Sequence, residues 1–370
     1  MRIAIDARGI NWYKGTGIGT YTENVIKNII NIEDGTYYHI YWNGKGYENF
    51  KKSNSKILMC SSRYHRFFEE NYIPLNIERE NIDIYHIPQN GIGLSTYIPC
   101  KKIVTIHDLI PYIMPETVGK GYLSKFLKEM PKIMEYADAI ITVSEYSKKD
   151  IIKYFPGFSN KIFVTPLAAD DIYKPMDKNY CKNYLKENYS INDPFILYVG
   201  GFSPRKNVKL LIRAFSEFIK SSRKKYKLVL IGVLKDEGDK ILKICEELNI
   251  MPDVIFPGYI EKEKLPIFYN GSECFVYPSL YEGFGLPPLE AMSCGTPVIT
   301  SDTSSIPEVT GNAAIKINPS SIYEIADAIG NVTSSDSLKN SLSMKGLERA
   351  RLFSWKKTAE KTLDIYKHII

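Results

Sequence analysis

The sequence predicts an α/β fold of two Rossmann-like domains, each a doubly wound parallel sheet, which face each other across a cleft. Three observations lead to this prediction. The chain has 370 residues, which is more than a single hydrophobic core usually serves. Short β-branched runs alternate with longer segments of helical periodicity. This alternation starts again after a polar stretch at residues 170–193, whose composition is typical of a linker between domains.

The first half of the chain contains the first set of expected strands and helices. Strands are expected at residues 3–5, 38–41, 57–59, 82–86, 102–106 and 139–143. A helix is expected at residues 23–32, after a glycine-rich loop, and another at residues 124–137, where Phe126, Met130 and Ile133 follow helical spacing. The alternation of strands with helices indicates a parallel sheet.

The second half repeats this order. Strands are expected at residues 195–199, 227–231, 254–256, 274–277 and 297–300. Helices are expected between them at residues 208–221, 240–248, 263–270 and 288–292. Ligands of such sheets collect beyond the carboxyl ends of the strands, so the loops that follow the strands are the candidates for a binding site.

Composition and charge exclude several classes of protein. Hydrophobic residues make up 44% and charged residues 24%, which is typical of soluble globular proteins, and no apolar run reaches the ~18 residues of a membrane span. The net charge of +6 suits a phosphate-bearing ligand or an anionic membrane surface. No stripe of aromatic and basic residues indicates nucleic-acid binding. The six cysteines form no C-x-x-C pair, so neither a zinc site nor a disulfide framework is expected.

The start of the sequence has no signal-peptide pattern, so we expect a cytoplasmic protein. The basic excess is also compatible with peripheral association with the inner face of the cell membrane.

The most informative segment runs from Tyr277 to Met292, with the sequence YPSLYEGFGLPPLEAM. It follows an expected strand and opens an expected helix, so the amides near Gly283 and Gly285 and the positive end of the helix would bind a phosphate. Glu282 would lie in the loop and Glu290 in the first turn of the helix, where carboxylates accept hydrogen bonds from sugar hydroxyls. A tight turn and a favourable helix start would explain each residue alone; the complete string favours a ligand site.

A second loop, VGGFSPRKN at residues 199–207, follows the first expected strand of the second half. Its Arg205 and Lys206 would bind a diphosphate and stabilise the negative charge that grows on a phosphate leaving group. A solvated surface pair is the alternative interpretation.

Two loops of the first half add further candidates. His107, in the string TIHDLIP at residues 105–111, would project from the carboxyl end of a strand into the cleft, although a lone histidine is more often structural. The loop GTGIGT at residues 15–20 contains Gly17. Its spacing is not the G-x-G-x-x-G of dinucleotide-binding proteins, so a backbone contact to a substrate is the preferred interpretation.

Together these strings resemble the family 4 retaining glycosyltransferases, also called glycosyltransferase group 1, which have the two-domain GT-B fold. The resemblance spans nearly the whole chain and includes the E-x7-E pattern from Glu282 to Glu290 and the opening I-D-A-R. It implies an acceptor-side domain at residues 1–185, a nucleotide-sugar donor domain at residues 186–352, and a helix at residues 353–370 that returns to the first domain.

The resemblance also implies residue roles. His107, Lys206 and Glu282 are the catalytic candidates, and Glu290 would bind the ribose hydroxyls. The other donor-binding candidates are Gly17, Arg205, Tyr259, Ile260, Gly283, Phe284, Gly285 and Leu286, of which Tyr259 and Ile260 would lie beside the nucleobase at a strand end. Many members carry an arginine where this chain has Gly201, and Arg205 would supply that charge.

The strings at residues 279–292 and 304–309 look most like those of bacterial mannosyltransferase-type members that build O-antigen or other surface polysaccharides. GDP-mannose is therefore the leading donor, and a hydroxyl of a glycan or lipid-linked molecule is the acceptor. No D-x-D motif occurs in the chain, so neither a metal nor another cofactor is expected. Retention would need either a covalent intermediate or attack on the same face of the sugar. No well-placed nucleophilic carboxylate is identified, and the resemblance favours the same-face route.

Other functions stay open at this point. They are a GT-B epimerase or phosphorylase, a glucosyltransferase that uses UDP- or ADP-glucose, a non-catalytic protein that binds sugar nucleotides, and an NAD-dependent oxidoreductase, which only the glycine loop and the α/β pattern favour. The sequence does not determine the oligomeric state.

Overall fold

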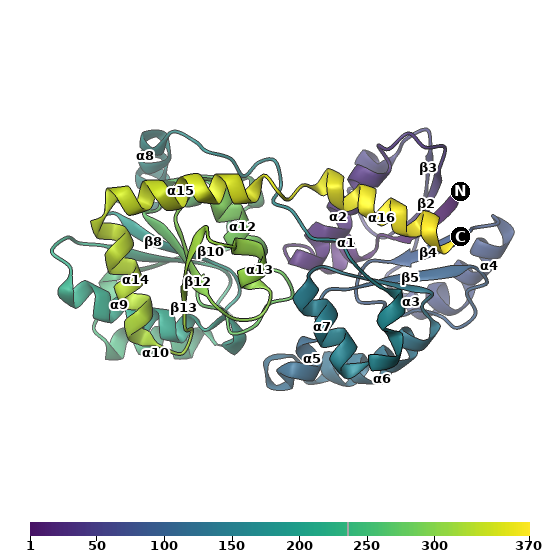
Figure 1. Ribbon diagram of the computed structural model, residues 1–370, viewed down its shortest axis with the longest axis horizontal. Coiled ribbons are helices and arrows are strands. Elements are labelled where there is room, and N and C mark those ends of the chain that lie inside the picture. The colour runs from purple at the N-terminus through teal and green to yellow at the C-terminus, as the bar shows by residue number, and fades with distance from the viewer. Residues whose placement is uncertain (235–236) are drawn as a thin grey trace. The chain divides into compact units, whose positions relative to one another are not determined.

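The computed structural model describes residues 1–234 and 237–370, which divide into two compact units. Unit 1 comprises Met1–Leu167 and Ser354–Ile370, and unit 2 comprises Ala168–Phe353. Each unit is a parallel sheet with helices packed on it (Figure 1). Within the described residues, no helix combines the length and the apolar character needed to cross a bilayer.

Unit 1 contains a seven-stranded sheet with the order β3-β2-β1-β4-β5-β6-β7, in which every neighbouring pair is parallel. Its strands are β1 (Arg2–Asp6), β2 (Tyr37–Trp42), β3 (Ser55–Met59), β4 (Ile84–Ile87), β5 (Lys101–Ile106), β6 (Ala139–Thr142) and β7 (Ile162–Val164). Side chains alternate between the faces of a sheet. Ile3 and Ile5 accordingly lie in one hydrophobic cluster and Ala4 in another.

The helices of unit 1 are α1 (Gly9–Trp12), α2 (Gly17–Ile29), α3 (His65–Phe67), α4 (Ile73–Arg79), α5 (Ile110–Ile113), α6 (Lys120–Tyr136), α7 (Glu145–Tyr154) and α16 (Trp355–Ile369), with a π-helical turn at Phe68–Tyr72. The last helix, α16, lies beside α2 (Figure 1) and buries Leu363 and Tyr366 in the same cluster as Ile3 and Ile5. Residues from both ends of the chain therefore cover one face of this sheet.

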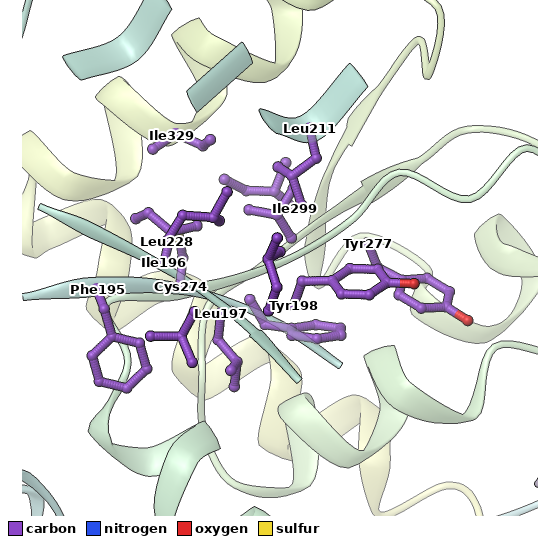
Figure 2. Packing of buried hydrophobic residues seen from close by; sticks show 14 of the residues in the cluster. Phe195, Ile196, Leu197, Tyr198, Leu211, Leu228, Cys274, Tyr277, Ile299 and Ile329 are labelled. Carbon is purple, nitrogen blue, oxygen red and sulfur yellow. The ribbon is translucent and has the colours of Figure 1, made fainter. Parts of the chain in front are cut away.

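Unit 2 contains a six-stranded parallel sheet with the order β10-β9-β8-β11-β12-β13. Its strands are β8 (Phe195–Val199), β9 (Lys227–Ile231), β10 (Val254–Gly258), β11 (Cys274–Tyr277), β12 (Val298–Ser301) and β13 (Ala314–Ile317). Its helices are α8 (Lys178–Tyr189), α9 (Val208–Ser221), α10 (Gly238–Glu247), α11 (Leu265–Gly271), α12 (Leu286–Ser293), α13 (Ile306–Thr310), α14 (Ile322–Ser334) and α15 (Asp336–Ala350). Figure 2 shows the core around β8, where Ile196 and Leu228 lie on the same side of the sheet as Ile299 and Ile329, and Leu197 points to the other side.

Both sheets reverse their strand order beside their first strand. The chain lays down β1, β2 and β3 in one direction and then places β4 on the other side of β1. In unit 2, β11 is placed on the other side of β8 in the same way. Ligands of doubly wound sheets bind at such switch points, beyond the carboxyl ends of the two strands. The residues after β1 and β4, and those after β8 and β11, are therefore the places to look for sites.

The predicted α/β class with two doubly wound parallel sheets is confirmed, and strands β8, β9 and β11 and helix α9 have the predicted bounds. Three expectations need correction. Residues 170–193 are not a plain linker, because they contain α8, which packs on α11 through Cys181 and Leu185. The chain divides after Leu167 rather than after residue 185 for the same reason. Helix α12 begins at Leu286, not at residue 288, so Glu290 lies in its second turn rather than its first.

Candidate functional site

The loops that follow β8 and β11 are joined by hydrogen bonds at the switch point of unit 2. The backbone N–H of Leu280 donates to the carbonyl oxygen of Arg205 at 2.8 Å. The side-chain amide of Asn207 donates to the carbonyl oxygens of Pro278 at 3.2 Å and Pro319 at 2.6 Å. Because β8 and β11 are parallel neighbours, their carboxyl ends place these two loops side by side.

The carboxylate of Glu282 is the centre of this arrangement, because four side chains converge on its Oε1. The Lys206 ammonium lies 2.7 Å from Oε1 and the Arg205 guanidinium 2.8 Å. The hydroxyls of Ser279 and Tyr277 donate to the same oxygen at 2.6 and 3.0 Å. The structure thus brings together three sequence-predicted site residues, Arg205, Lys206 and Glu282.

These contacts keep Glu282 ionised. Burial alone raises the pKa of this carboxyl group, but Lys206 and then Arg205 oppose burial and lower the pKa to about 2. Two cations share one carboxylate, so the cluster keeps a net positive charge. Such a cluster attracts anionic ligands such as phosphates.

Tyr277 connects the cluster to the hydrophobic core. Its ring stacks beside that of Tyr198, with centroids 6.0 Å apart, and Figure 2 shows the two hydroxyls pointing the same way. The ammonium of Lys206 lies 5.0 Å from the centroid of the Tyr277 ring and also donates to the Tyr277 hydroxyl. A rigid core residue therefore fixes the position of the Lys206 ammonium.

The glycine-rich turn between Glu282 and α12 is held from one side by two serines. The N–H of Glu282 donates to Oγ of Ser304 at 3.0 Å, and the hydroxyl of Ser305 contacts the carbonyl oxygens of Glu282 and Phe284 at 2.8 and 2.7 Å. Gly285 adopts φ of 119°, which side chains rarely allow, and a Cβ there would meet Ile306 at 3.6 Å. The conformation of the backbone at the start of α12 thus depends on glycine at this position.

Glu290 lies on α12 in a second environment, among aromatic hydroxyls. Its Oε2 accepts a hydrogen bond from the Tyr269 hydroxyl at 3.0 Å, and only 8% of the residue is exposed. Burial raises the pKa of Glu290 to about 7, although Tyr269 and Tyr173 act in the opposite direction. Among residues 1–234 and 237–370, no cation lies in hydrogen-bond contact with Glu290. A buried carboxylate in this setting is costly, and further hydrogen-bond donors from a ligand would stabilise it.

The remaining donor-site candidates of unit 2 are less enclosed. Tyr259 follows β10 directly and is 61% exposed, whereas Ile260 beside it is buried. Gly201 is exposed, and a Cβ built there meets no atom within 4 Å. The position has room for a larger side chain.

The two candidates of unit 1 differ from each other. Gly17 is the exposed first residue of α2, whose Thr16 cap accepts the N–H of Gly19. His107 follows β5 and is 5% exposed; its Nε2 donates to the carbonyl oxygen of Pro88 at 2.8 Å, and its ring packs edge-on against Tyr21. Burial lowers the pKa of His107 to about 4, so the imidazole is neutral at physiological pH.

The sequence interpretation missed two participants, Tyr277 and Ser279. Both stand in the segment that begins at Tyr277, but neither was assigned a role. The available signal was position: Tyr277 is the last residue of β11, and the loop that follows must turn back over it to place Glu282.

Comparisons with known proteins agree on the class of protein. The sequence model of the family "Glycosyl transferases group 1" matches residues 184–349, and that of "Glycosyltransferase Family 4" matches residues 17–171. The O-antigen chain mannosyltransferase B of Escherichia coli is 30% identical over 96% of this chain and 97% of its own length.

Two further matches are more limited, one in coverage and one in sequence identity. The serotype-specific mannosyltransferase WbdA of Escherichia coli is 30% identical over 74% of this chain, which corresponds to 34% of that longer protein. Sucrose-phosphate synthase from Thermosynechococcus elongatus has a TM-score of 0.77 over 100% of this chain and 99% of that chain, at 20% sequence identity. The latter likeness concerns the fold.

Proposed function

Because the chain belongs to the group 1, family 4 glycosyltransferases, we propose that it transfers mannose from GDP-mannose, with retention of anomeric configuration, to a hydroxyl of a glycan or lipid-linked acceptor in bacterial surface-polysaccharide synthesis. The observation that carries the sugar assignment is the 30% identity to an O-antigen chain mannosyltransferase over nearly the full length of both chains. The charged cluster of unit 2 supports a nucleoside-diphosphate sugar as the donor.

Each part of the donor meets a suitable group in this proposal. The diphosphate binds Arg205 and Lys206, whose net positive charge with Glu282 is described above. The ribose hydroxyls donate to Glu290, which supplies the acceptor atoms they need. The nucleobase lies beside Tyr259 and Ile260, and Glu282 with the amides of residues 283–286 contacts the sugar and phosphate.

Lys206 and Arg205 have the main catalytic role. Negative charge accumulates on the diphosphate as the glycosidic bond breaks, and cations held in place before the reaction stabilise that charge without reorganisation. The stacked Tyr277 holds Lys206, and the Tyr281 carbonyl accepts a hydrogen bond from Arg205. His107 borders the sugar as a neutral imidazole in this scheme.

Retention follows from attack on the face that the diphosphate leaves. The departing phosphate oxygen accepts the proton of the acceptor hydroxyl, so no separate base is required in this route. We also propose that the fixed cations and amides act without a divalent metal, since the chain has no D-x-D motif.

A thermal-shift screen tests the donor. GDP-mannose should raise the unfolding temperature more than UDP-glucose, UDP-N-acetylglucosamine or ADP-glucose, since a ligand at a hundred times its Kd stabilises by about 2.7 kcal/mol. A larger shift with a uridine or adenosine donor would move the assignment to a glucosyltransferase.

Product analysis separates the remaining classes. Transfer of labelled mannose to an α-linked mannobiose acceptor, with an α anomeric signal in the product, is the expected result. Release of a free epimerised sugar would indicate an epimerase, and donor binding without transfer or hydrolysis would indicate a binding protein.

A further inference from the structure

Unit 1 contains a cavity of about 220 Å³ that the proposed donor site does not use. Its lining includes Trp12 and Tyr13 from the end of α1, Gln89 after β4, and His65 and Glu69 from the helical segment before α4. Residues that follow β1 and β4 meet here, at the switch point of the sheet. A dry cavity of about 150 Å³ holds benzene, so this cavity has room for one six-membered ring.

Two side chains at or beside the cavity have buried polar atoms without partners among the described residues: Gln89 of the lining, and Arg8, which contacts the lining residues Glu69 and Trp12. Gln89 is 1% exposed, and within residues 1–234 and 237–370 neither its Nε2 nor its Oε1 has a hydrogen-bond partner. The Nη1 atom of the buried Arg8 is also unpaired in the described part of the chain. A buried polar group without a partner costs about 1–3 kcal/mol. Each such group needs an explanation, and a water or a ligand that completes its hydrogen bonds is one.

Two glycines make room for the polar side chains of this cavity. A Cβ at Gly9 would lie 2.9 Å from Oε1 of Gln89, and a Cβ at Gly93 would lie 2.8 Å from the carboxyl carbon of Glu69. Any larger residue at either position would displace these side chains. The backbone is therefore shaped around an amide and a carboxylate.

Arg8 positions the carboxylate and the aromatic ring. Asp6 holds the guanidinium through two hydrogen bonds, at 2.8 and 2.7 Å, and Arg8 reaches Oε1 of Glu69 at 3.2 Å. The same guanidinium lies 4.6 Å from the centroid of the Trp12 ring, which is 40% exposed. Burial raises the pKa of Glu69, and Arg8 opposes this shift.

We propose that this cavity is a saccharide subsite that holds one uncharged hexose ring of the acceptor, with Gln89 and Glu69 bonded to its hydroxyls and Trp12 packed on its apolar face. An amide offers two donors and an acceptor, and a carboxylate accepts from hydroxyls. An aromatic ring supplies apolar area. Glu69 and Lys125 balance in formal charge, so the lining favours a neutral ring over an anionic one. The assignment of this ring to the acceptor rests on the proposed function. The assignment of a sugar site to the cavity does not depend on it.

Saturation-transfer NMR tests the subsite on the full chain. The probes are the methyl α-glycosides of mannose, glucose and galactose, and at least one should receive saturation from the protein. Gln89→Leu keeps the side-chain size but removes the amide, and should weaken binding of that probe about tenfold or more through lost hydrogen bonds. Trp12→Ala should weaken it similarly, whereas the exposed Tyr97→Ala, an aromatic outside the lining, is the matched control and should leave binding unchanged.

Gly9→Ala is a second route to the same result, because its methyl group would push the Gln89 amide aside. In transfer assays Gln89→Leu should raise the acceptor KM while the Kd for the donor and the rate of donor hydrolysis stay at parent values. Folding of each variant is checked by its urea midpoint.

Two results would overturn the inference: no glycoside binds the parent, or Gln89→Leu and Trp12→Ala bind the probe as the parent does. Failure of the proposed function is a separate outcome. In that case GDP-mannose produces no thermal shift, while a glycoside still binds unit 1 and responds to Gln89→Leu.

Discussion

Replacement of Glu290 by glutamine should stabilise the ligand-free protein above neutral pH. Burial gives this carboxyl a pKa of about 7 in the folded state, against 4.5 as its ordinary value. A raised carboxyl pKa does not lower the stability below pH 4.5, where the carboxyl is protonated in both the folded and the unfolded state. The loss of stability grows as pH rises from 4.5 to 7, because the unfolded state ionises first. The two pKa values differ by about 2.5, and one pKa step corresponds to about 1.4 kcal/mol, so the full cost is about 3 kcal/mol. Glu290→Gln stays neutral and should recover up to this amount at pH 8.

The distribution of tryptophans provides a control within the same sample. Trp12, Trp42 and Trp355 all belong to unit 1, whereas Glu290 belongs to unit 2. Urea unfolding is followed by tryptophan fluorescence, which reports unit 1, and by circular dichroism, which reports both units. The gain should appear in the dichroism transition at pH 8 and vanish at pH 4.

The same substitution should weaken GDP binding, measured by calorimetry, because glutamine offers one acceptor oxygen in place of two to the ribose hydroxyls. An equal urea midpoint for Glu290→Gln and the parent at pH 8, or a gain that does not change between pH 4 and pH 8, would refute the electrostatic reasoning. Unchanged affinity for GDP would remove Glu290 from the ribose.

Four further outcomes are expected. Glu282→Gln should destabilise the protein by about 3 kcal/mol at pH 7, since its lowered pKa of about 2 contributes stability above pH 4.5 that is lost as pH falls toward 2; a urea midpoint equal to that of the parent at pH 7 would contradict this. Lys206→Ala should reduce kcat on the order of a hundredfold with a smaller change in donor Kd. Lys206→Arg should recover only part of the lost kcat, because a planar guanidinium does not replace a compact ammonium. A kcat within about twofold of the parent for both variants would show that Lys206 has no catalytic role. Activity should persist in EDTA, and loss that magnesium or manganese restores would disprove metal independence. Gly201→Arg should leave the melting temperature unchanged, because a Cβ there meets no atom within 4 Å, and should tighten GDP binding by adding a cation; a lower melting temperature or weaker binding would count against it.

The parts of the fold that were predictable have strong local signals. Helix α9 buries Leu211, Ile212 and Phe215 on one face, so its periodicity is clear in the sequence. Strands β7 and β13 lie at sheet edges and have three and four residues, too few to show a pattern. Helix α8 buries only Cys181 and Leu185, which left it with the appearance of a polar linker.

The candidate site was also predictable only in part. The motif placed Glu282 near Arg205 and Lys206 because parallel neighbouring strands end at one edge of a sheet. The pairing of Tyr277 with Glu282 depends on how the loop turns, which residue types do not encode. The cavity of unit 1 was also not predicted, because its lining residues come from separate stretches of the chain that only the fold brings together.

The return of α16 to unit 1 sets the order in which the two units can be completed during synthesis. Tyr366, which lies 2.6 Å from Nδ1 of His86, is separated from it by 280 residues. Domains usually fold as the ribosome delivers them, the first before the second. Here unit 2 is continuous in the chain and can close while unit 1 still lacks the helix that covers one face of its sheet. Until α16 has left the ribosome and packed on unit 1, Ile3, Ile5 and their neighbours lack part of their cover, although α2 already contributes Ile26 and Ile29 to this cluster.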